Sequence, residues 1–242
     1  MLDENLRQDC VLRLQSRRIL YGMQPRAVTA GRPSRGEEVA NSVTHAVGAV
    51  LAMAGLVVLV FSASRYGTAR SIIGCVVFGA ALVLLYSAST LYHSVGPGHA
   101  RAKAVLRVLD HSAIFLLIAG TYTPFTLVSL RGPWGWSLFG VVWGLALAGI
   151  TLRLVLRHRP TAPFVALYLA MGWCVVVAAK PLLAALVPGG IALLAAGGVA
   201  YSTGVVFYAW RSLPYAHAIW HGFVLVGSAF HFAAVLLYVA RA

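Results

Sequence analysis

The sequence predicts an all-α integral membrane protein, a bundle of seven transmembrane helices. Of its 242 residues, 60% are hydrophobic and only 10% are charged. A soluble domain needs far more charge to cover its surface, so the lipid bilayer is the expected solvent. A hydrocarbon core about 30 Å thick is crossed by about 20 helical residues. From residue 43 onward the chain has room for seven such segments and little else.

The seven predicted helices follow one another through short connections. Their apolar runs cover residues 43–64, 71–93, 109–130, 134–152, 162–183, 190–210 and 215–239. Connections this short make neighbouring helices antiparallel. We expect one domain at residues 37–242, preceded by a polar, Arg-rich cytoplasmic tail at residues 1–36. Because the tail contains no apolar stretch of the kind found in signal peptides, we expect no cleavable signal there.

The distribution of Lys and Arg predicts that the amino terminus is cytoplasmic and the carboxyl terminus is outside. Basic residues favour the cytoplasmic ends of membrane helices. With the tail inside, fourteen of the 19 basic residues lie in inner segments: Arg7, Arg13, Arg17, Arg18, Arg26, Arg32, Arg35, Arg101, Lys103, Arg107, Arg153, Arg157, Arg159 and Arg211. The other five are Arg65, Arg70, Arg131, Lys180 and Arg241. This orientation is opposite to that of a G-protein-coupled receptor and argues against that class.

The net charge of +13 does not indicate a nucleic-acid-binding protein. Most basic residues lie in the tail or in short loops between apolar runs, which is typical of membrane topology and of contact with anionic lipid headgroups. The three cysteines, Cys10, Cys75 and Cys174, are too scattered for a disulfide framework or a cysteine metal motif. We therefore expect a multipass protein of the cell membrane, and nothing in the sequence indicates its oligomeric state.

One acidic residue stands apart within the predicted spans. Beyond residue 38, Asp110 is the only carboxylate, and it lies at the start of the third predicted helix. A bare charge costs about 2.5–3.5 kcal/mol at the centre of a membrane helix and less near an interface. A structural interpretation is that Asp110 caps the helix or pairs with Arg107. The functional interpretation is that this carboxylate serves a site inside the bundle.

The histidines favour the functional interpretation. His217 and His221 are four residues apart, so both imidazoles project from one face of the last helix. In the predicted topology this helix starts on the inner side, where the second helix ends at His93 and the third begins at Asp110. Three histidines and an open position form a standard catalytic zinc site, although iron, nickel or cobalt suit the same ligands. We predict zinc at His93, His217 and His221, with Asp110 accepting a proton and Ser89 holding a ligand or water in place.

A polar face on the first helix remains open to two interpretations. Glu38, Asn41 and His45 are spaced so that they share one helical face, entering the first helix from the inner side. They line the cytoplasmic mouth of the bundle, or His45 replaces one of the three predicted ligands.

The remaining histidines are less suited to the metal. His231 lies ten residues past His221, roughly 15 Å further along the helix axis, and we expect a buried hydrogen-bonded role for it. His99 and His158 lie in basic loops, where we expect them to be solvated. His111 points about 100° away from the neighbouring carboxylate around the third helix.

With these motifs the sequence resembles the hemolysin III family, the bacterial branch of the progestin and adipoQ receptor family. The motifs that carry the resemblance are Glu38-x-x-Asn41-x-x-x-His45, Ser89-Thr90-Leu91-Tyr92-His93, Leu109-Asp110-His111-Ser112 through Gly120-Thr121-Tyr122-Thr123-Pro124-Phe125, and Pro214-Tyr215-Ala216-His217-x-x-x-His221 with His231. The resemblance implies a seven-helix bundle with cytoplasmic-side zinc on His93, His217 and His221. It also implies that Asp110 contacts zinc-bound water, that Ser89 supports the site, and a link to ceramide-like lipid amides. It offers no role for the Arg-rich tail.

Three function classes follow. The leading hypothesis is a zinc-dependent hydrolase of a lipid amide or ester, resembling alkaline ceramidases and acting at the inner leaflet, with an apolar cavity for the acyl chain. The second is a non-catalytic sensor of membrane lipid composition in which zinc only braces the helices; a filled metal shell and no acyl-sized cavity would favour it. The third is a pore-forming, haemolysin-like protein, which lacks support because the spans carry no ring of charged residues.

Overall fold

The computed structural model describes residues 33–156 and 161–242. Most of the Arg-rich tail and the loop residues Arg157, His158 and Arg159 lie outside the described residues. The predicted boundary between tail and membrane domain stays a prediction.

The predicted fold class is confirmed: seven helices of the described residues are long and apolar enough to cross a membrane. They are α2 (Arg35–Tyr66), α3 (Ala69–Ser94), α4 (Ala100–Pro124) with the wide turn η2 (Phe125–Ser129), α5 (Pro133–Val155), α6 (Ala162–Gly172) with η3 (Cys174–Ala178) and α7 (Ala179–Ala185), α8 (Pro188–Ala209), and α9 (Ala216–Tyr238). A short turn, η1 (Pro97–His99), joins α3 to α4. Which end of the bundle faces the cytoplasm stays a prediction.

Two helices begin earlier than their apolar runs. The first run was predicted at residues 43–64 and the third at 109–130, whereas α2 begins at Arg35 and α4 begins at Ala100. Hydropathy detects only the part of a helix that suits the hydrocarbon, and a helix continues into the polar interface where its charged side chains reach water. The predicted loop at residues 94–108 is therefore mostly helical. As a consequence Asp110 lies well inside α4 instead of at its start.

The fifth span is interrupted, where a continuous run at residues 162–183 was predicted. α6 ends at Gly172, and η3 and α7 complete the crossing. Inside a membrane, backbone groups released by such a break need partners from the protein. The Tyr122 hydroxyl provides them: it donates to the carbonyls of Met171 (2.9 Å) and Gly172 (2.8 Å) and accepts from the N–H of Val175 (3.0 Å).

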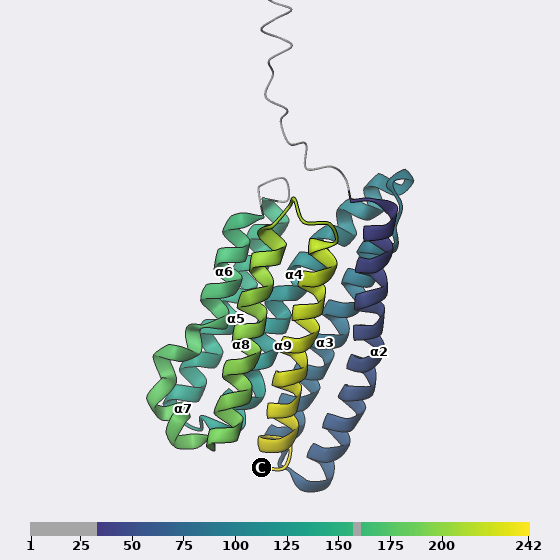
Figure 1. The fold of residues 1–242 in the computed structure, drawn as a ribbon. Coiled ribbons are helices and arrows are strands. Elements are labelled where there is room, and N and C mark those ends of the chain that lie inside the picture. The colour runs from purple at the N-terminus through teal and green to yellow at the C-terminus, as the bar shows by residue number, and fades with distance from the viewer. Residues whose placement is uncertain (1–32, 157–160) are drawn as a thin grey trace, which may run out of the picture. The chain divides into compact units, whose positions relative to one another are not determined.

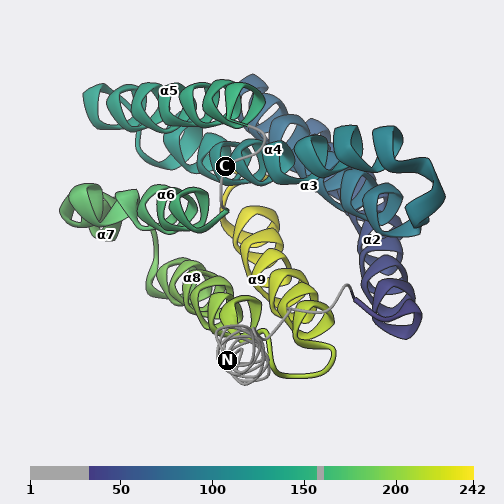
Figure 2. The same ribbon diagram turned by 90° about the horizontal axis from the view of Figure 1, so that it is seen from above.

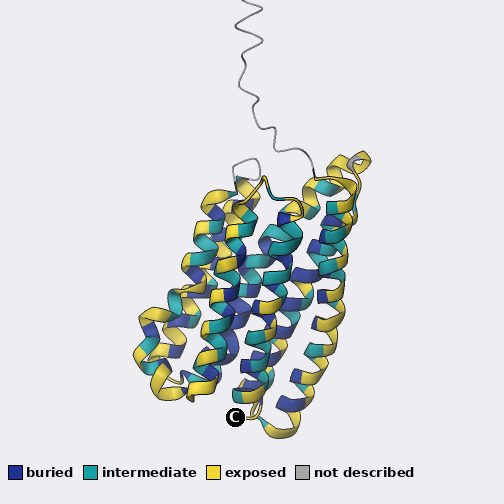
Figure 3. Cartoon of the chain, viewed as in Figure 1, coloured by how far each residue is buried: buried dark blue, intermediate teal, exposed yellow. Residues whose placement is uncertain are grey.

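The helices form a bundle with α9 near its middle (Figure 1). Seen from above, α9 lies between α2 and α8, and α6 lies between α4 and α8 (Figure 2). Many positions along the helices are exposed, as the yellow parts of the ribbon in Figure 3 show. Large apolar residues are among them, and Val57, Phe61 and Val177 are examples. Lipid is the natural cover for such faces.

Glycines allow the closest helix contacts. A Cβ added at Gly79 would lie 2.5 Å from a methyl carbon of Leu56, and one at Gly74 would lie 2.7 Å from the Cα of Pro124. Small residues at helix crossings let backbones approach closely, which is how membrane helices gain packing energy without a hydrophobic driving force. These contacts hold α3 between α2 and α4.

Candidate metal centre

Three histidines meet at one end of the bundle, where α3 ends and α9 begins. His93, His217 and His221 each offer a ring nitrogen, and these nitrogens all lie within 4.8 Å of one another. His221 is 2% exposed and His93 is 8% exposed. The i, i+4 spacing on α9 keeps the two rings of His217 and His221 4.5 Å apart, from centroid to centroid. This group can hold one metal ion, and it is the set of ligands that the sequence predicted.

Glu38, on the first turn of α2, orients His93. The His93 Nδ1 lies 2.7 Å from Glu38 Oε2, while Lys103 Nζ donates to Glu38 Oε1 at 2.7 Å. A carboxylate accepts, so Nδ1 carries the proton and the lone pair is left on Nε2. That Nε2 is buried without a hydrogen-bond partner among the described residues. A ligand histidine held by a carboxylate through its other nitrogen is the usual arrangement around protein-bound metals.

Asn41, one turn further along α2, orients the ring of His221. The His221 Nδ1 donates to the Asn41 backbone carbonyl at 3.3 Å, which leaves His221 Nε2 for the group. The sequence predicted Glu38 and Asn41 at the cytoplasmic mouth of the bundle, and the structure places them against two of the three histidines. The sequence showed that Glu38 and Asn41 share a helical face with His45. It did not show that Glu38 contacts His93 and that Asn41 contacts His221.

His45 lies beside the histidine group and is not a member of it. Its ring stacks on that of His221, with centroids 3.5 Å apart and planes 17° from parallel, and it meets the Tyr86 ring edge-on at 5.1 Å. The nitrogens that lie within 4.8 Å of one another come from the other three histidines. The geometry therefore favours the original three ligands over a set that includes His45.

The entry to α9 is also tied to α2. Tyr215, which precedes the helix, has a φ of 57°, in the left-handed region that non-glycine residues rarely adopt. Its backbone N–H donates to Glu37 Oε1 at 3.1 Å. An acidic side chain at a helix amino terminus is favourable. This contact holds the first turn of α9, and with it His217, against the start of α2.

Asp110 neither caps a helix nor pairs with Arg107. α4 begins at Ala100, so Asp110 has no free helix end to cap. Its side chain is 13% exposed, and its Oδ2 lies 3.5 Å from His111 Nδ1, a contact that is an ion pair only when the imidazole is protonated. That Nδ1 donates to the Arg107 carbonyl at 2.7 Å. The capping interpretation of Asp110 is wrong because α4 begins ten residues earlier. The alternative pairing with Arg107 is not formed in the described part of the chain, where the Asp110 carboxylate lies near His111.

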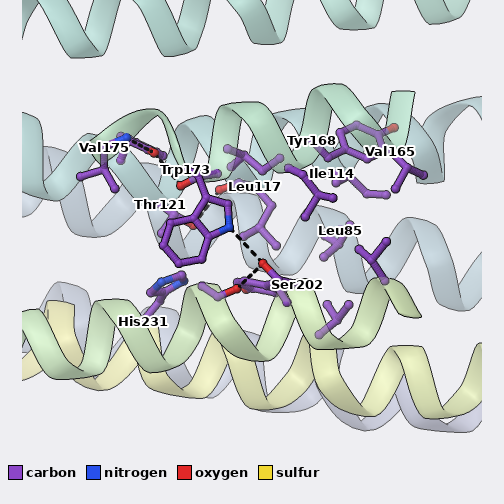
Figure 4. A pocket seen from close by; sticks show the side chains of 18 of the residues that line it. Leu85, Ile114, Leu117, Thr121, Val165, Tyr168, Trp173, Val175, Ser202 and His231 are labelled. Atoms are coloured by element: carbon purple, nitrogen blue, oxygen red, sulfur yellow. Dashed lines mark hydrogen bonds between the residues drawn. The ribbon is translucent and has the colours of Figure 1, made fainter. Parts of the chain in front are cut away.

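A cavity of about 300 Å³ begins at the histidine group and extends between α4, α6, α8 and α9. Its polar end is lined by Ser89, Asp110, His217 and His221, and Ser89, which is buried, lies beside Asp110. The rest of the wall is mainly apolar, as the close-up in Figure 4 shows with Leu85, Ile114, Leu117 and Val165. A volume of this size is in the range of small-molecule and lipid sites.

Two residues at the polar end of the cavity, His111 and Tyr168, were not predicted there from the sequence. His111 was expected to point away from Asp110, yet both residues line the cavity. Tyr168 lines it as well and donates its hydroxyl to the His111 carbonyl at 2.8 Å. No sequence motif or regular spacing marks Tyr168 as a site residue. Its position in the cavity wall follows from the packing of α6 on α4.

Residues 34–232 match the family described as "Haemolysin-III related". The chain belongs to the haemolysin III family. This member of the family is 47% identical to "Hemolysin-3" of Bacillus cereus over 203 residues, which cover 84% of this chain and 92% of that protein. It is 46% identical to "Hemolysin-3 homolog" of Bacillus subtilis over 205 residues, covering 85% and 95%. It is 28% identical to the human "Monocyte to macrophage differentiation factor" over 225 residues, covering 90% and 92%.

The family match confirms the resemblance and that the protein is a multipass membrane protein. The matched range of this haemolysin III family member runs from before Glu38 to just beyond His231. It therefore contains every residue of the histidine group, its α2 contacts and the cavity's polar end. Zinc as the bound metal and hydrolysis as the activity belong to the proposal that follows.

Proposed function

We propose that this protein is a zinc-dependent hydrolase of a lipid amide or ester, acting at the inner leaflet of the cell membrane. One observation carries the proposal: the three-histidine group lies at the polar end of an acyl-sized apolar cavity whose wall also includes the carboxylate of Asp110. A metal-binding group, a candidate base and a lipid-sized space in one continuous site are what such an enzyme needs.

The donor set fits zinc. Neutral imidazoles are borderline-soft ligands, and three of them with an open position suit a catalytic zinc ion. The contacts of His93 with Glu38 and of His221 with the Asn41 carbonyl fix both rings with one nitrogen free. A bound zinc ion supplies Lewis acidity toward a carbonyl oxygen and makes water more acidic.

The chain's own residues supply the proton chemistry. Asp110 accepts the proton of the attacking water and returns it to the leaving amine or alcohol, so that one carboxylate serves both halves of the reaction. Ser89, beside Asp110 in the cavity wall, positions the water or the carbonyl. The apolar wall holds the acyl chain and keeps bulk water away from the scissile bond.

The test is metal analysis and turnover on purified full-length protein. Zinc is measured by mass spectrometry of the metal, and release of free fatty acid is followed for a panel of N-acyl lipids and glycerolipid esters. We expect about one zinc per chain and release of acid from at least one lipid class. His217→Ala, which removes a ligand, is the control and should lose both zinc and turnover. Zinc-loaded protein that releases no acid from any lipid would contradict the proposal.

One observation favours a second candidate, a sensor of membrane composition. The histidine group draws on α3 and α9 for its nitrogens and on α2 for its orienting contacts, so a bound metal also braces three helices. A sensor would retain zinc, show no turnover, and change its thermal midpoint with the lipid that fills the cavity. The turnover assay therefore separates the two functions.

The surface near the histidine group suits an anionic membrane face. Arg101, Arg107 and Arg211 are exposed at that end of the bundle. We propose that they contact anionic headgroups of the inner leaflet, which attract juxtamembrane basic residues by about 1 kcal/mol each. This would place the membrane lipid substrate beside the polar end of the cavity.

A further inference from the structure

The cavity reaches the outer surface of the bundle along one seam, between the fifth span and α8. Of the described residues that line the cavity, three are exposed: Gly172, Trp173 and Ala195. Gly172 and Trp173 lie where the fifth span is interrupted, and Ala195 lies on α8, the helix beside it in Figure 2. The other described lining residues are buried or half-buried. The exposed part of the cavity wall therefore belongs to the two helices that border this seam.

The seam lies in the hydrocarbon region of the membrane. Trp173 is the twelfth of the 24 residues of the fifth span, Ala162–Ala185. Val176 and Val177, close to it in the chain, are 59% and 75% exposed, and Val199 on α8 is 54% exposed. Exposed apolar side chains at the middle of a span face acyl chains. What lies outside this seam is therefore lipid.

Trp173, which is 41% exposed, extends from the fifth span across the seam to α8. Its ring N–H donates to Ser202 Oγ at 3.0 Å, and this bond, drawn in Figure 4, is itself exposed. The ring also packs over Gly198, where an added Cβ would lie 3.5 Å from it. Tryptophan in membrane proteins favours the interfaces, and an indole N–H in hydrocarbon needs a partner. At mid-span, the bond to Ser202 satisfies that N–H and keeps the ring over the seam.

The indole can swing aside while the backbone around it stays in place. The Tyr122 hydroxyl bonds to backbone groups on both sides of the break, which fixes the interrupted span to α4. Ser202 Oγ donates to the Gly198 carbonyl at 2.8 Å, so it keeps a partner when the indole leaves. Opening the seam therefore breaks one hydrogen bond, and the net contribution of a single hydrogen bond is modest.

The neighbouring seam, between α8 and α9, is closed at this level. His231 on α9 is buried, and its Nε2 donates to the Leu194 carbonyl of α8 at 3.3 Å. The two helices are in close contact there, since a Cβ at Gly197 would lie 2.6 Å from that Nε2. His231 thus has the buried, hydrogen-bonded role expected from the sequence, and its packing leaves no room for a chain between α8 and α9.

We propose that the hydrocarbon chain of a membrane lipid enters and leaves the cavity sideways, through the seam between the fifth span and α8, and that the Trp173 indole, held by Ser202, is its movable cover. A lipid chain is the occupant because the seam lies among lipid-facing apolar side chains and leads into a mainly apolar cavity. Entry by this route rests on the proposed function in one respect, that the ligand is a lipid, and does not require that the lipid be cleaved.

The test is the rate at which a photoreactive stearate, with a diazirine in the middle of its chain, reaches the cavity of full-length protein in nanodiscs. Vesicles that contain the probe are mixed with the nanodiscs, samples are irradiated at increasing times, and labelled residues are identified by mass spectrometry. Labelling of Leu117, which is 4% exposed and lines the cavity, reports entry. Labelling of Phe61, which is 69% exposed on α2, reports arrival in the surrounding bilayer. We expect both to be labelled, Leu117 later, and absence of label on Leu117 at every time would overturn the proposal.

Two matched variants of α8 locate the entrance. Ala195→Trp places an indole at an exposed position that lines the cavity, whereas Ala192→Trp places one at an exposed position of the same helix outside the cavity wall. We expect Ala195→Trp to lose early labelling of Leu117 and Ala192→Trp to be labelled like the wild-type protein, with Phe61 labelled equally in all three. Equal rates at Leu117 in the two variants would mean that the chain enters elsewhere and would overturn the proposal.

Two further variants test the cover. Ser202→Ala removes the acceptor of the indole N–H and should speed the labelling of Leu117 roughly threefold to tenfold, the effect of losing one hydrogen bond. Trp173→Ala removes the cover itself and should speed the labelling further. A wild-type rate in Ser202→Ala would overturn the role of Trp173, whether or not the Trp173→Ala protein folds.

Entry and turnover fail separately. Labelling of Leu117 that depends on Ala195 and Ser202, in a protein that releases no acid from any lipid, would support sideways entry and contradict the hydrolase. Turnover of a lipid by a protein whose labelling is unaffected by Ala195→Trp and Ser202→Ala would do the reverse.

Discussion

Glu38 Oε2 and His93 Nδ1 lie 2.7 Å apart, across the interface between the start of α2 and the end of α3. The same carboxylate accepts from Lys103 Nζ at 2.7 Å, so three helices converge on it. A carboxylate behind a ligand histidine fixes the ring and makes its free nitrogen a better ligand. α2 therefore contributes to the candidate metal centre by orienting histidines that belong to other helices.

The first prediction concerns this contact. Glu38→Gln preserves the size of the side chain but removes the charge that holds the His93 ring. Zinc affinity should fall about 10- to 100-fold, the usual effect of losing such a partner. The measurement is a competition titration against a chelator of known affinity.

The neighbouring residue offers a matched control. Glu37→Gln changes the same kind of side chain on the same helix turn. Its amide oxygen can still accept from the Tyr215 N–H, and the carboxylate that holds the His93 ring is that of Glu38. It should bind zinc as the wild-type protein does. Equal losses in both variants would mean that charge at this end of the bundle matters and the specific contact does not.

The second prediction separates ligands from neighbours. His217→Ala/His221→Ala should lose stoichiometric zinc and unfold at a lower temperature, because a metal that binds only the folded state stabilises it. His45→Phe keeps an aromatic ring stacked on His221 and removes both nitrogens, so it should retain one zinc. Metal content and thermal midpoints of the purified variants check both statements. Zinc retained by the double variant, or lost from His45→Phe, would reassign the ligands.

The third prediction concerns the packing of α2 on α3. Gly79→Val places a side chain where a Cβ already lies 2.5 Å from Leu56, and such overpacking costs about 1–3 kcal/mol. Gly140→Val on α5 is the control, because nothing lies within 4 Å of a Cβ there. Thermal unfolding in one detergent should show a lower midpoint for Gly79→Val only.

The fourth prediction is the orientation. Fourteen of the 19 Lys and Arg residues lie in segments assigned to the cytoplasmic side, so a reporter that is active only outside the membrane should give signal when fused after Ala242. A reporter that is active only in the cytoplasm should give signal when fused before Met1. The opposite pair of results would reverse the topology and move the histidine group to the outer leaflet.

The sequence could predict the helices and the three histidines because both depend on one-dimensional features. Hydropathy over about 20 residues finds a span, and alternating direction brings the end of α3 and the start of α9 to one side. The contact between Glu38 and His93 could not be predicted, since it depends on how far α2 is rotated about its axis. The early start of α4 could not be predicted from hydropathy, because Arg101, Lys103 and Arg107 lower the mean hydropathy of that segment to a value typical of loops. The contact of Trp173 with Ser202 follows only from the packing of the fifth span beside α8.

The last prediction tests the carboxylate of α4. Asp110→Asn keeps the shape of the side chain and removes both its charge and its ability to accept a proton. Asp110 lies well inside α4, away from the helix start at Ala100, so this variant should fold and keep zinc on the three histidines.

Its turnover should fall by roughly 100- to 10,000-fold, the range for loss of a general base. Ser89→Ala is the matched control: it alters the residue beside Asp110 in the cavity without removing a base, so it should lose less. An Asp110→Asn protein with full zinc and full turnover would rule out proton transfer by this residue. One that folds but no longer binds zinc would instead place the carboxylate among the ligands. Retained metal together with lost turnover is the result that the proposed role of Asp110 predicts, because the amide keeps the shape of the side chain and cannot take up the proton.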